Sequence, residues 1–227
     1  MKRVFDKYKN QHFLTFYNRT ESKLFKDYKH IKSNIEFAAY KNKYQTVSFI
    51  SPTSGEGKTT TCCHLALTFA REGKNVLLID GNLNHPMLNK IFHVKNDYGL
   101  SNVLVGQKKL SESINTTQFE SLKLLTSGPT MANFNPILQS SAMDHLIGEV
   151  KEKFDFIFID NPPVLDSDTG KIIASKSDGT VLVVRDHKTD INEMLEAKRV
   201  LDAYAVNLIG VIFNGKKLSI KDRLIRA

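Results

Sequence analysis

The segment from Ser51 to Thr60 carries the residues best suited to bind phosphate. It reads S-P-T-S-G-E-G-K-T-T and lies between a β-branched apolar run and a stretch of helical period. Glycines in such a turn let backbone amides approach phosphate oxygens, and the following helix adds the positive end of its dipole. Lys58 would neutralise the β- and γ-phosphates, and the hydroxyl of Thr59 would ligate Mg²⁺. We therefore expect ATP and Mg²⁺ to bind at a P-loop formed by Ser54, Gly55, Glu56, Gly57, Lys58, Thr59 and Thr60.

The loop is a variant, because Pro52 stands where the strict G-x-x-x-x-G-K-[ST] pattern begins with glycine. Two apolar runs then end in a carboxylate, V-L-L-I-D at Asp80 and F-D-F-I-F-I-D at Asp160. A P-loop needs such a carboxylate at the end of a neighbouring buried strand, and we assign Asp160 to the Mg²⁺ shell. We expect Asp80 to be a second metal ligand or the group that polarises an attacking hydroxyl. The alternative for Asp80 is a helix cap or turn residue.

The rest of the chain supplies the elements that must position these groups. From residue 46 onward, short apolar runs alternate with stretches of helical period, which is typical of repeated βα units. The sequence predicts an α/β fold, a parallel sheet covered by helices on both faces, of the P-loop NTPase type. The expected strands are 46–51, 75–80, 122–126, 154–160, 180–184 and 208–213, and the expected helices are 58–72, 136–152, 168–176 and 190–204.

The length of 227 residues suits one domain built around one core. We divide it into a basic N-terminal segment, 1–45, a P-loop core, 46–214, and a basic tail, 215–227. Apolar residues recur at helical spacing within 20–40, which predicts an amphipathic helix. Cys62 and Cys63 are adjacent in an expected helix, where they cannot form a disulfide, and we expect both to be buried.

The net charge of +8 is concentrated at the two ends. Residues 1–45 hold 11 lysines and arginines against 4 acidic residues, and residues 215–227 hold 5 against 1. Such ends could meet an anionic membrane, nucleic acid or an acidic partner, or could simply be solvated. No run approaches the roughly 18 apolar residues that span a bilayer, and the N-terminus has no apolar core of a signal peptide. We expect a cytoplasmic protein.

Several motifs together resemble the cytoplasmic bacterial tyrosine kinases of capsule and exopolysaccharide synthesis, which are related to the MinD/ParA group of P-loop ATPases. The motifs are S-x-x-x-G-E-G-K-T, V-L-L-I-D-x-N-L-x-x-P, L-L-T-S-G-P, F-D-F-I-F-I-D-N-P-P-V and L-I-G-V-I-F-N-G, and they cover roughly residues 20–217. The resemblance implies catalytic roles for Lys58, Asp80 and Asp160, and an adenine contact for Asn214. It also implies a membrane-embedded chain-length regulator as partner, whose cytoplasmic tail would recruit the chain to the inner face of the membrane.

The sequence departs from the family pattern in three places. The usual D-x-D-x-R motif keeps Asp80 but has Asn82 and Asn84, so one carboxylate and one guanidinium are missing. The usual C-terminal tyrosine cluster is absent from 205–227, which leaves tyrosines such as Tyr8, Tyr17 or Tyr28, or those of another protein, as acceptors. The E-x-x-R-x-x-R pattern that packs subunits into a ring is replaced by Lys26, Lys29 and Lys32. We expect these lysines to weaken that homo-oligomer, and they are either solvated or in a ring contact.

Three functions follow from these observations. The leading interpretation is an autokinase-type protein-tyrosine kinase that regulates polysaccharide synthesis or export. The alternative, favoured by Asn82 and Asn84, is an ATP-binding switch or scaffold of the same system with weak catalysis. A partitioning ATPase of MinD/ParA type would use the basic ends on membrane or DNA, but Thr53 stands where that group has its signature lysine. We expect no specific nucleic acid partner.

Overall fold

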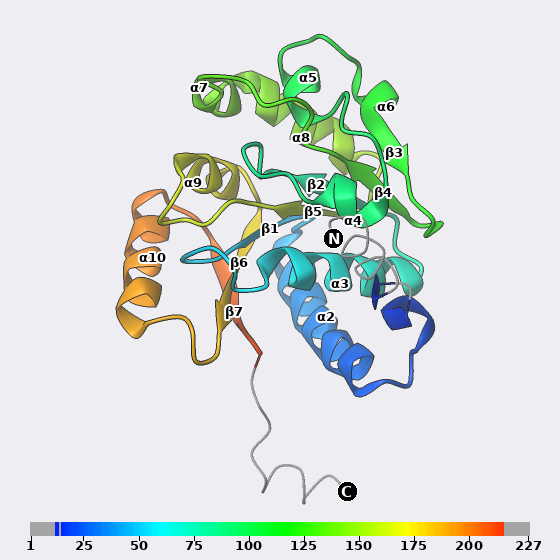
Figure 1. Ribbon diagram of the computed structural model, residues 1–227, viewed down its shortest axis with the longest axis vertical. Coiled ribbons are helices and arrows are strands. Elements are labelled where there is room, and N and C mark those ends of the chain that lie inside the picture. The colour runs from blue at the N-terminus through cyan, green and yellow to red at the C-terminus, as the bar shows by residue number, and fades with distance from the viewer. Residues whose placement is uncertain (1–11, 14, 216–227) are drawn as a thin grey trace, which may run out of the picture.

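The computed structural model describes residues 12, 13 and 15–215, and its centre is a seven-stranded sheet (Figure 1). The strand order is β3-β4-β2-β5-β1-β6-β7. All neighbours are parallel except β3, which runs antiparallel to β4 at one edge. This confirms the predicted parallel sheet. The strands are β1 Thr46–Ile50, β2 Val76–Asp80, β3 Ile114–Thr116, β4 Leu122–Leu125, β5 Phe156–Asp160, β6 Gly179–Arg185 and β7 Leu208–Asn214.

Helices cover both faces of the sheet (Figure 1). Helices α2 and α3 pack on one face, and α8, α9 and α10 pack on the other. Short helices lie between the strands, mostly in the region 81–121. The helices are α2 Lys23–Asn42, α3 Lys58–Arg71, α4 Leu88–Phe92, α5 Leu100–Leu104, α6 Leu110–Ser113, α7 Asn135–Gln139, α8 Ser141–Lys151, α9 Asp168–Ser175 and α10 Ile191–Ala203.

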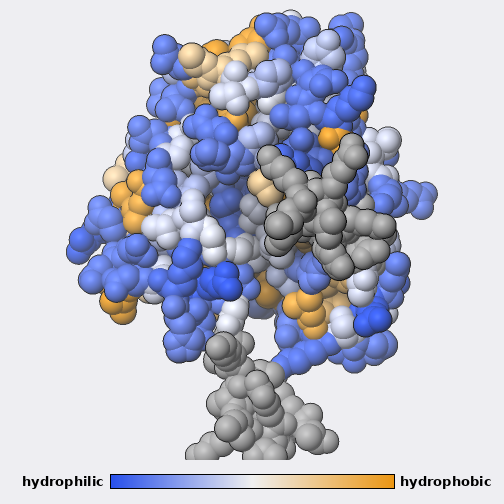
Figure 2. All heavy atoms as spheres, viewed as in Figure 1, coloured by the Kyte–Doolittle hydropathy of each residue, from blue (hydrophilic) through white to orange (hydrophobic). Residues whose placement is uncertain are grey.

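The strands are apolar on both faces because each face meets helices. In β5, Phe158 packs toward α2 and α3, whereas Ile157 and Ile159 pack toward α8 and α9. Cys62 and Cys63 are free and buried in the first of these layers, as predicted. The surface in Figure 2 is mostly hydrophilic with small scattered apolar patches, which fits a core enclosed between the sheet and its helices.

The structure departs from the expected elements where helices are short. The sequence predicted one helix over 136–152, but the chain forms α7 and α8 with Ser140 extended between them. The Ser140 hydroxyl accepts a hydrogen bond from the amide of Ala142 and caps α8. Strand β3 and the short helices α4, α5 and α6 were not predicted, because such short elements hold too few residues to show a period.

The lysines of α2 form ion pairs within the chain. The two alternatives considered from the sequence, a solvated basic face and a ring contact, did not include such pairs. Lys32 is 6% exposed, and its ammonium lies 2.7 Å from Glu36 and 3.0 Å from Glu72 at the end of α3. Lys29 also pairs with Glu72, at 2.7 Å, and Lys26 pairs with an exposed glutamate. The complementary anions are therefore present in the same chain, and two of these lysines join α2 to α3.

No helix among the described residues is long and apolar enough to cross a membrane. The predicted basic segments, 1–45 and 215–227, lie partly outside the residues that the structure describes. Residues 1–11, 14 and 216–227, with the candidate acceptor Tyr8, lie outside the described residues.

Candidate nucleotide-binding and phosphotransfer site

The turn between β1 and α3 has the backbone geometry of an anion-binding loop. Gly55 and Gly57 have φ angles of +78° and +87°, which side-chain-bearing residues rarely adopt. A Cβ atom on Gly57 would lie only 1.9 Å from the side-chain nitrogen of Asn214. Gly57 is also the N-cap of α3 and provides no side-chain cap. The first amides of α3 have no partner within the helix, so they are available to phosphate oxygens.

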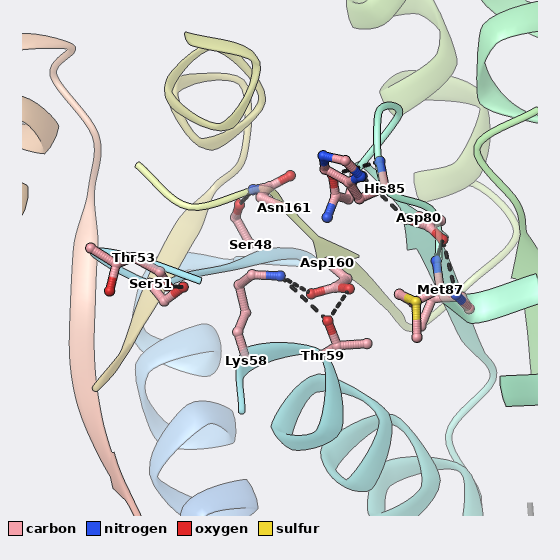
Figure 3. A network of polar contacts seen from close by, with 12 residues as sticks. Ser48, Ser51, Thr53, Lys58, Thr59, Asp80, His85, Met87, Asp160 and Asn161 are labelled. Carbon is pink, nitrogen blue, oxygen red and sulfur yellow. Dashed lines mark hydrogen bonds and ion pairs between the residues drawn. The ribbon is translucent and has the colours of Figure 1, made fainter. Parts of the chain in front are cut away.

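Lys58, Thr59 and Asp160 meet in front of this loop (Figure 3). The Lys58 ammonium lies 2.7 Å from one carboxylate oxygen of Asp160, and the Thr59 hydroxyl donates to the other oxygen at 2.7 Å. Both charged side chains are buried, with exposures of 7% for Lys58 and 1% for Asp160. A phosphate group would offer Lys58 a second anion, and Mg²⁺ would offer one cation to Thr59 and Asp160 together.

Asp80 lies beside Asp160 in the register of β2 and β5 but has different partners. It is fully buried, and its oxygens accept hydrogen bonds from the backbone amides of Asn82 at 3.1 Å and of Met87 and Leu88 at 3.0 Å each. Burial, followed by the negative charge of Asp160, raises the pKa of Asp80 from 3.8 to about 7, against the opposing effect of the three amides. In this structure Asp80 anchors the turn between β2 and α4 and does not contact Lys58 or Thr59.

The side chain of Glu56 forms hydrogen bonds that fix the P-loop. The sequence predicted Glu56 only as one of the phosphate-binding residues of this loop. Its side chain is 1% exposed. One carboxylate oxygen accepts from both the amide and the hydroxyl of Thr53, at 3.1 and 2.8 Å. The other accepts from the hydroxyl of Thr189 at 2.7 Å. Glu56 therefore ties the loop to the connection between β6 and α10.

Three residues distant in sequence brace the outer side of the loop. Arg185 donates to the carbonyl of Gly55 at 3.3 Å, and Lys188 donates to the carbonyl of Ser54. Asn214 donates to the carbonyl of Glu56 at 2.9 Å, so this predicted adenine residue does lie at the P-loop. Arg185 and Lys188 were not predicted, since their only signal in the sequence was their position after an apolar strand.

A cavity of about 290 Å³ lies over these groups. Besides the loop, it is lined by Asn82, Pro163 and Arg185, so Arg185 adds a second cation to that of Lys58. The described residues contain no group of three or more His, Cys, Asp or Glu able to hold a metal by themselves. A hydroxyl and one carboxylate suit Mg²⁺ that keeps waters and also binds phosphates, so these residues fit a metal that enters with its nucleotide. The cavity is lined by Ser51, Ser54, Gly55, Glu56, Gly57, Lys58, Thr59, Thr60, Asn82, Pro163 and Arg185.

Two of the candidate acceptor tyrosines are poorly placed for phosphorylation. Tyr28 is 8% exposed, and burial raises the pKa of its hydroxyl to about 12. Tyr17 packs against Phe119, with the guanidinium of Arg71 5.0 Å from its ring centre. Burial therefore disfavours Tyr28 as an acceptor in the folded chain.

The fold and site define a P-loop ATPase of the MinD/ParA type. Residues 44–197 match a family model described as an AAA domain. The structure of MinD from Pyrococcus horikoshii in complex with Mg-ADP aligns with a TM-score of 0.66 at 27% identity, over 78% of this chain and 73% of MinD.

Within this class, the chain belongs to the bacterial tyrosine kinases. It is 37% identical to the tyrosine-protein kinase YwqD of Bacillus subtilis, over 85% of this chain and 81% of YwqD. It is 30% identical to the putative tyrosine-protein kinase CapB of Staphylococcus aureus, over 88% of each chain. The structure of the chimerical protein CapA2B2 aligns with a TM-score of 0.84 at 29% identity, over 89% of both chains. The family resemblance seen in the sequence is thus confirmed.

Proposed function

We propose that this tyrosine kinase transfers the γ-phosphoryl group of ATP to tyrosine hydroxyls in the control of capsular or exopolysaccharide synthesis. The observation that carries the proposal is the contact of the buried Lys58 and Asp160 with the half-buried Thr59 at the N-terminus of an uncapped helix. The phenol oxygen would form a bond to the γ-phosphorus as the bond to the ADP oxygen breaks, and the phenol proton would leave to a base or water. Mg²⁺, when bound, would neutralise charge on the phosphates.

Each residue has a distinct part in this proposal. Lys58 would leave Asp160 and bind the phosphates, because the developing negative charge is the stronger attraction in a buried site. Asp160 and Thr59 would then be free to hold the metal. Asp80 remains a proposed metal or base residue, and it could act only after exchanging one of its three loop amides for that new partner. Its present contacts agree with the alternative role of a turn residue.

We further propose that the chain is cytoplasmic and acts at the inner face of the membrane with the cytoplasmic tail of a polysaccharide chain-length regulator. The support is the similarity to CapB and to the chimerical CapA2B2. The basic segments 1–45 and 215–227 would add attraction to anionic lipids. Because Lys29 and Lys32 are engaged with Glu72, we propose that the ring contact made by α2 in relatives is weak here, so a monomer or small oligomer is expected in light scattering at moderate salt.

One experiment separates the kinase from the alternative, a weakly catalytic switch. The hydrogen bonds that hold Asp80 in its turn, and the amide of Asn82 in place of a carboxylate, favour the switch. Purified chain is incubated with ATP, Mg²⁺ and the cytoplasmic tail of a candidate regulator, and phosphotyrosine and bound nucleotide are measured together. The kinase produces phosphotyrosine that depends on Lys58. Nucleotide binding without phosphotyrosine, with or without the tail, would contradict the kinase and support the switch.

A further inference from the structure

A second cavity, of about 620 Å³, lies beside the phosphate cavity. Neighbouring residues of the same two connections, those that follow β2 and β5, line both cavities. In the first wall Asn82 lines the phosphate cavity, while Leu83 and Asn84 line the second one. In the other wall Pro163 lines the phosphate cavity, while Asp166 lines the second one. A molecule held in the second cavity would therefore lie next to the transferred phosphoryl group.

The interior of this second cavity is partly apolar. Leu83 and Phe134 line it and are each 6% exposed, and the partly buried Met131 packs against the same apolar cluster. A hydrogen bond of 2.8 Å from the hydroxyl of Thr169 to Asn135 joins the starts of α9 and α7, which form its far wall. An aromatic ring would gain contact area on such a surface.

The rim of the cavity is negative. Asp166 is exposed and forms no ion pair with any residue from 15 to 215. Asp168 also lines the rim, but its carboxylate lies 2.7 Å from the ammonium of Lys171. Asp166 is therefore the carboxylate free to attract a cation on an incoming molecule.

We propose that this second cavity binds the acceptor, a polypeptide segment whose tyrosine is flanked by lysine or arginine, and that Asp166 selects it. The proposal rests on the kinase function proposed above and names its substrate class. The tyrosine ring would lie against Leu83 and Phe134, and the hydroxyl would face the phosphate cavity. Asp166 is a positioning residue in this proposal, since it touches the segment beside the tyrosine and not the reacting atoms.

The occupant we assign is the basic N-terminal segment of the chain itself, residues 1–11. It reads M-K-R-V-F-D-K-Y-K-N-Q, so Tyr8 lies between Lys7 and Lys9. Tyr40 also precedes a lysine and is 90% exposed, but it lies in the last turns of α2, where the helical backbone cannot extend into a cavity. Residues 1–11 hold Lys2, Arg3, Lys7 and Lys9 against Asp6, so their charge complements the negative rim.

The test measures phosphotransfer from ATP to two synthetic peptides, FDKYKNQ and the charge-reversed FDEYENQ. Wild type is compared with Asp166→Asn and Asp166→Lys. The control is Asp27→Asn, which removes an exposed carboxylate from α2 on the opposite face of the sheet. An exposed charge pair contributes little to binding, so we expect about a threefold rise in KM for FDKYKNQ in Asp166→Asn, with kcat unchanged. Asp166→Lys should reverse the preference between the peptides, and the control should match wild type.

Each outcome decides between the two proposals. Phosphorylation of both peptides with equal KM in wild type and Asp166→Lys would overturn the assignment of the cavity and leave the kinase intact. Nucleotide binding without phosphorylation of either peptide, by any of the variants, would instead contradict the kinase. In the whole chain, Tyr8→Phe should lower autophosphorylation, whereas Tyr40→Phe should not. An effect of Tyr40→Phe alone would overturn the choice of occupant.

Discussion

Asp80 and Asp160 occupy matching positions at the ends of neighbouring strands, yet their surroundings differ in kind. Asp160 is bound by the side chains of Lys58 and Thr59, whose positions can change when phosphate and metal arrive. Asp80 is bound by three backbone amides of the turn that follows it. Side-chain partners can be exchanged at low cost, whereas backbone amides hold a carboxylate in place and fix the turn. The same residue type at the same edge of the sheet is therefore held by side chains in one strand and by the backbone of the following turn in the other, and we propose ligand exchange only for the first.

The largest effect is expected from removing the exchangeable cation of this pair. Lys58→Met should lower phosphotransfer by about 10²–10³-fold, because the ammonium stabilises charge on the transferred group. It should also weaken ATP·Mg²⁺ binding by about 1.5–3 kcal/mol in calorimetry. Lys90→Met, at an exposed position of α4, is the matched control. Unchanged nucleotide affinity in Lys58→Met would show that the assigned P-loop is not the binding site.

The second largest effect is expected from Asp80, whose titration should change the free energy of unfolding with pH. The pKa of Asp80 is about 7 in the folded chain, above its ordinary 3.8, so between these values the folded state holds more protons than the unfolded state. Its contribution to stability is present at low pH and is lost as pH rises toward 7. Relative to Asp80→Asn, which does not titrate, wild type should lose about 3 kcal/mol between pH 4 and 7.

Urea unfolding in the presence of EDTA and without nucleotide measures this difference. Asp27→Asn, the exposed carboxylate of α2, should show no comparable trend. A constant difference between wild type and Asp80→Asn across this range would mean that Asp80 is ionised throughout, as in a residue poised for metal rather than one buried in a turn.

A third carboxylate would sharpen the contrast between the two strand ends. Asn82 lines the phosphate cavity, and its side chain accepts a hydrogen bond of 3.3 Å from the amide of His85. Asn82→Asp would place an exchangeable anion near the metal, and we expect about a tenfold gain in phosphotransfer to an added tyrosine peptide, about 1.4 kcal/mol. Asn84→Asp, which faces the neighbouring cavity, should gain less. Equal rates in wild type and Asn82→Asp would show that the missing carboxylate costs nothing.

The sequence predicted the exchangeable half of the site better than the anchored half. Lys58 and Asp160 follow from local patterns, a strand-to-helix turn and an apolar strand end, so both could be placed from the order of residues alone. The partners of Asp80 are backbone amides of the turn that follows β2. The pattern of side chains in the sequence does not predict the backbone path of this turn. Arg185 and Thr189 meet the P-loop across more than 100 residues, through the pairing of β1 with β6. Such contacts depend on the register of the sheet, which the strand pattern alone does not determine.

The smallest expected effect concerns Asn214. It contacts neither Asp80 nor Asp160, but it is hydrogen-bonded to the P-loop. Its side chain donates to the carbonyl of Glu56 at 2.9 Å and packs against Gly57. Asn214→Ala removes one neutral hydrogen bond at a half-buried site, so ATP·Mg²⁺ binding should weaken by about 1 kcal/mol, roughly fivefold in Kd. If Asn214 also contacts adenine, as the family resemblance implies, the loss should be larger for ATP than for inorganic triphosphate. Equal losses for both ligands would show that Asn214 acts only through the P-loop backbone, and a larger loss for ATP would show that it also recognises the base.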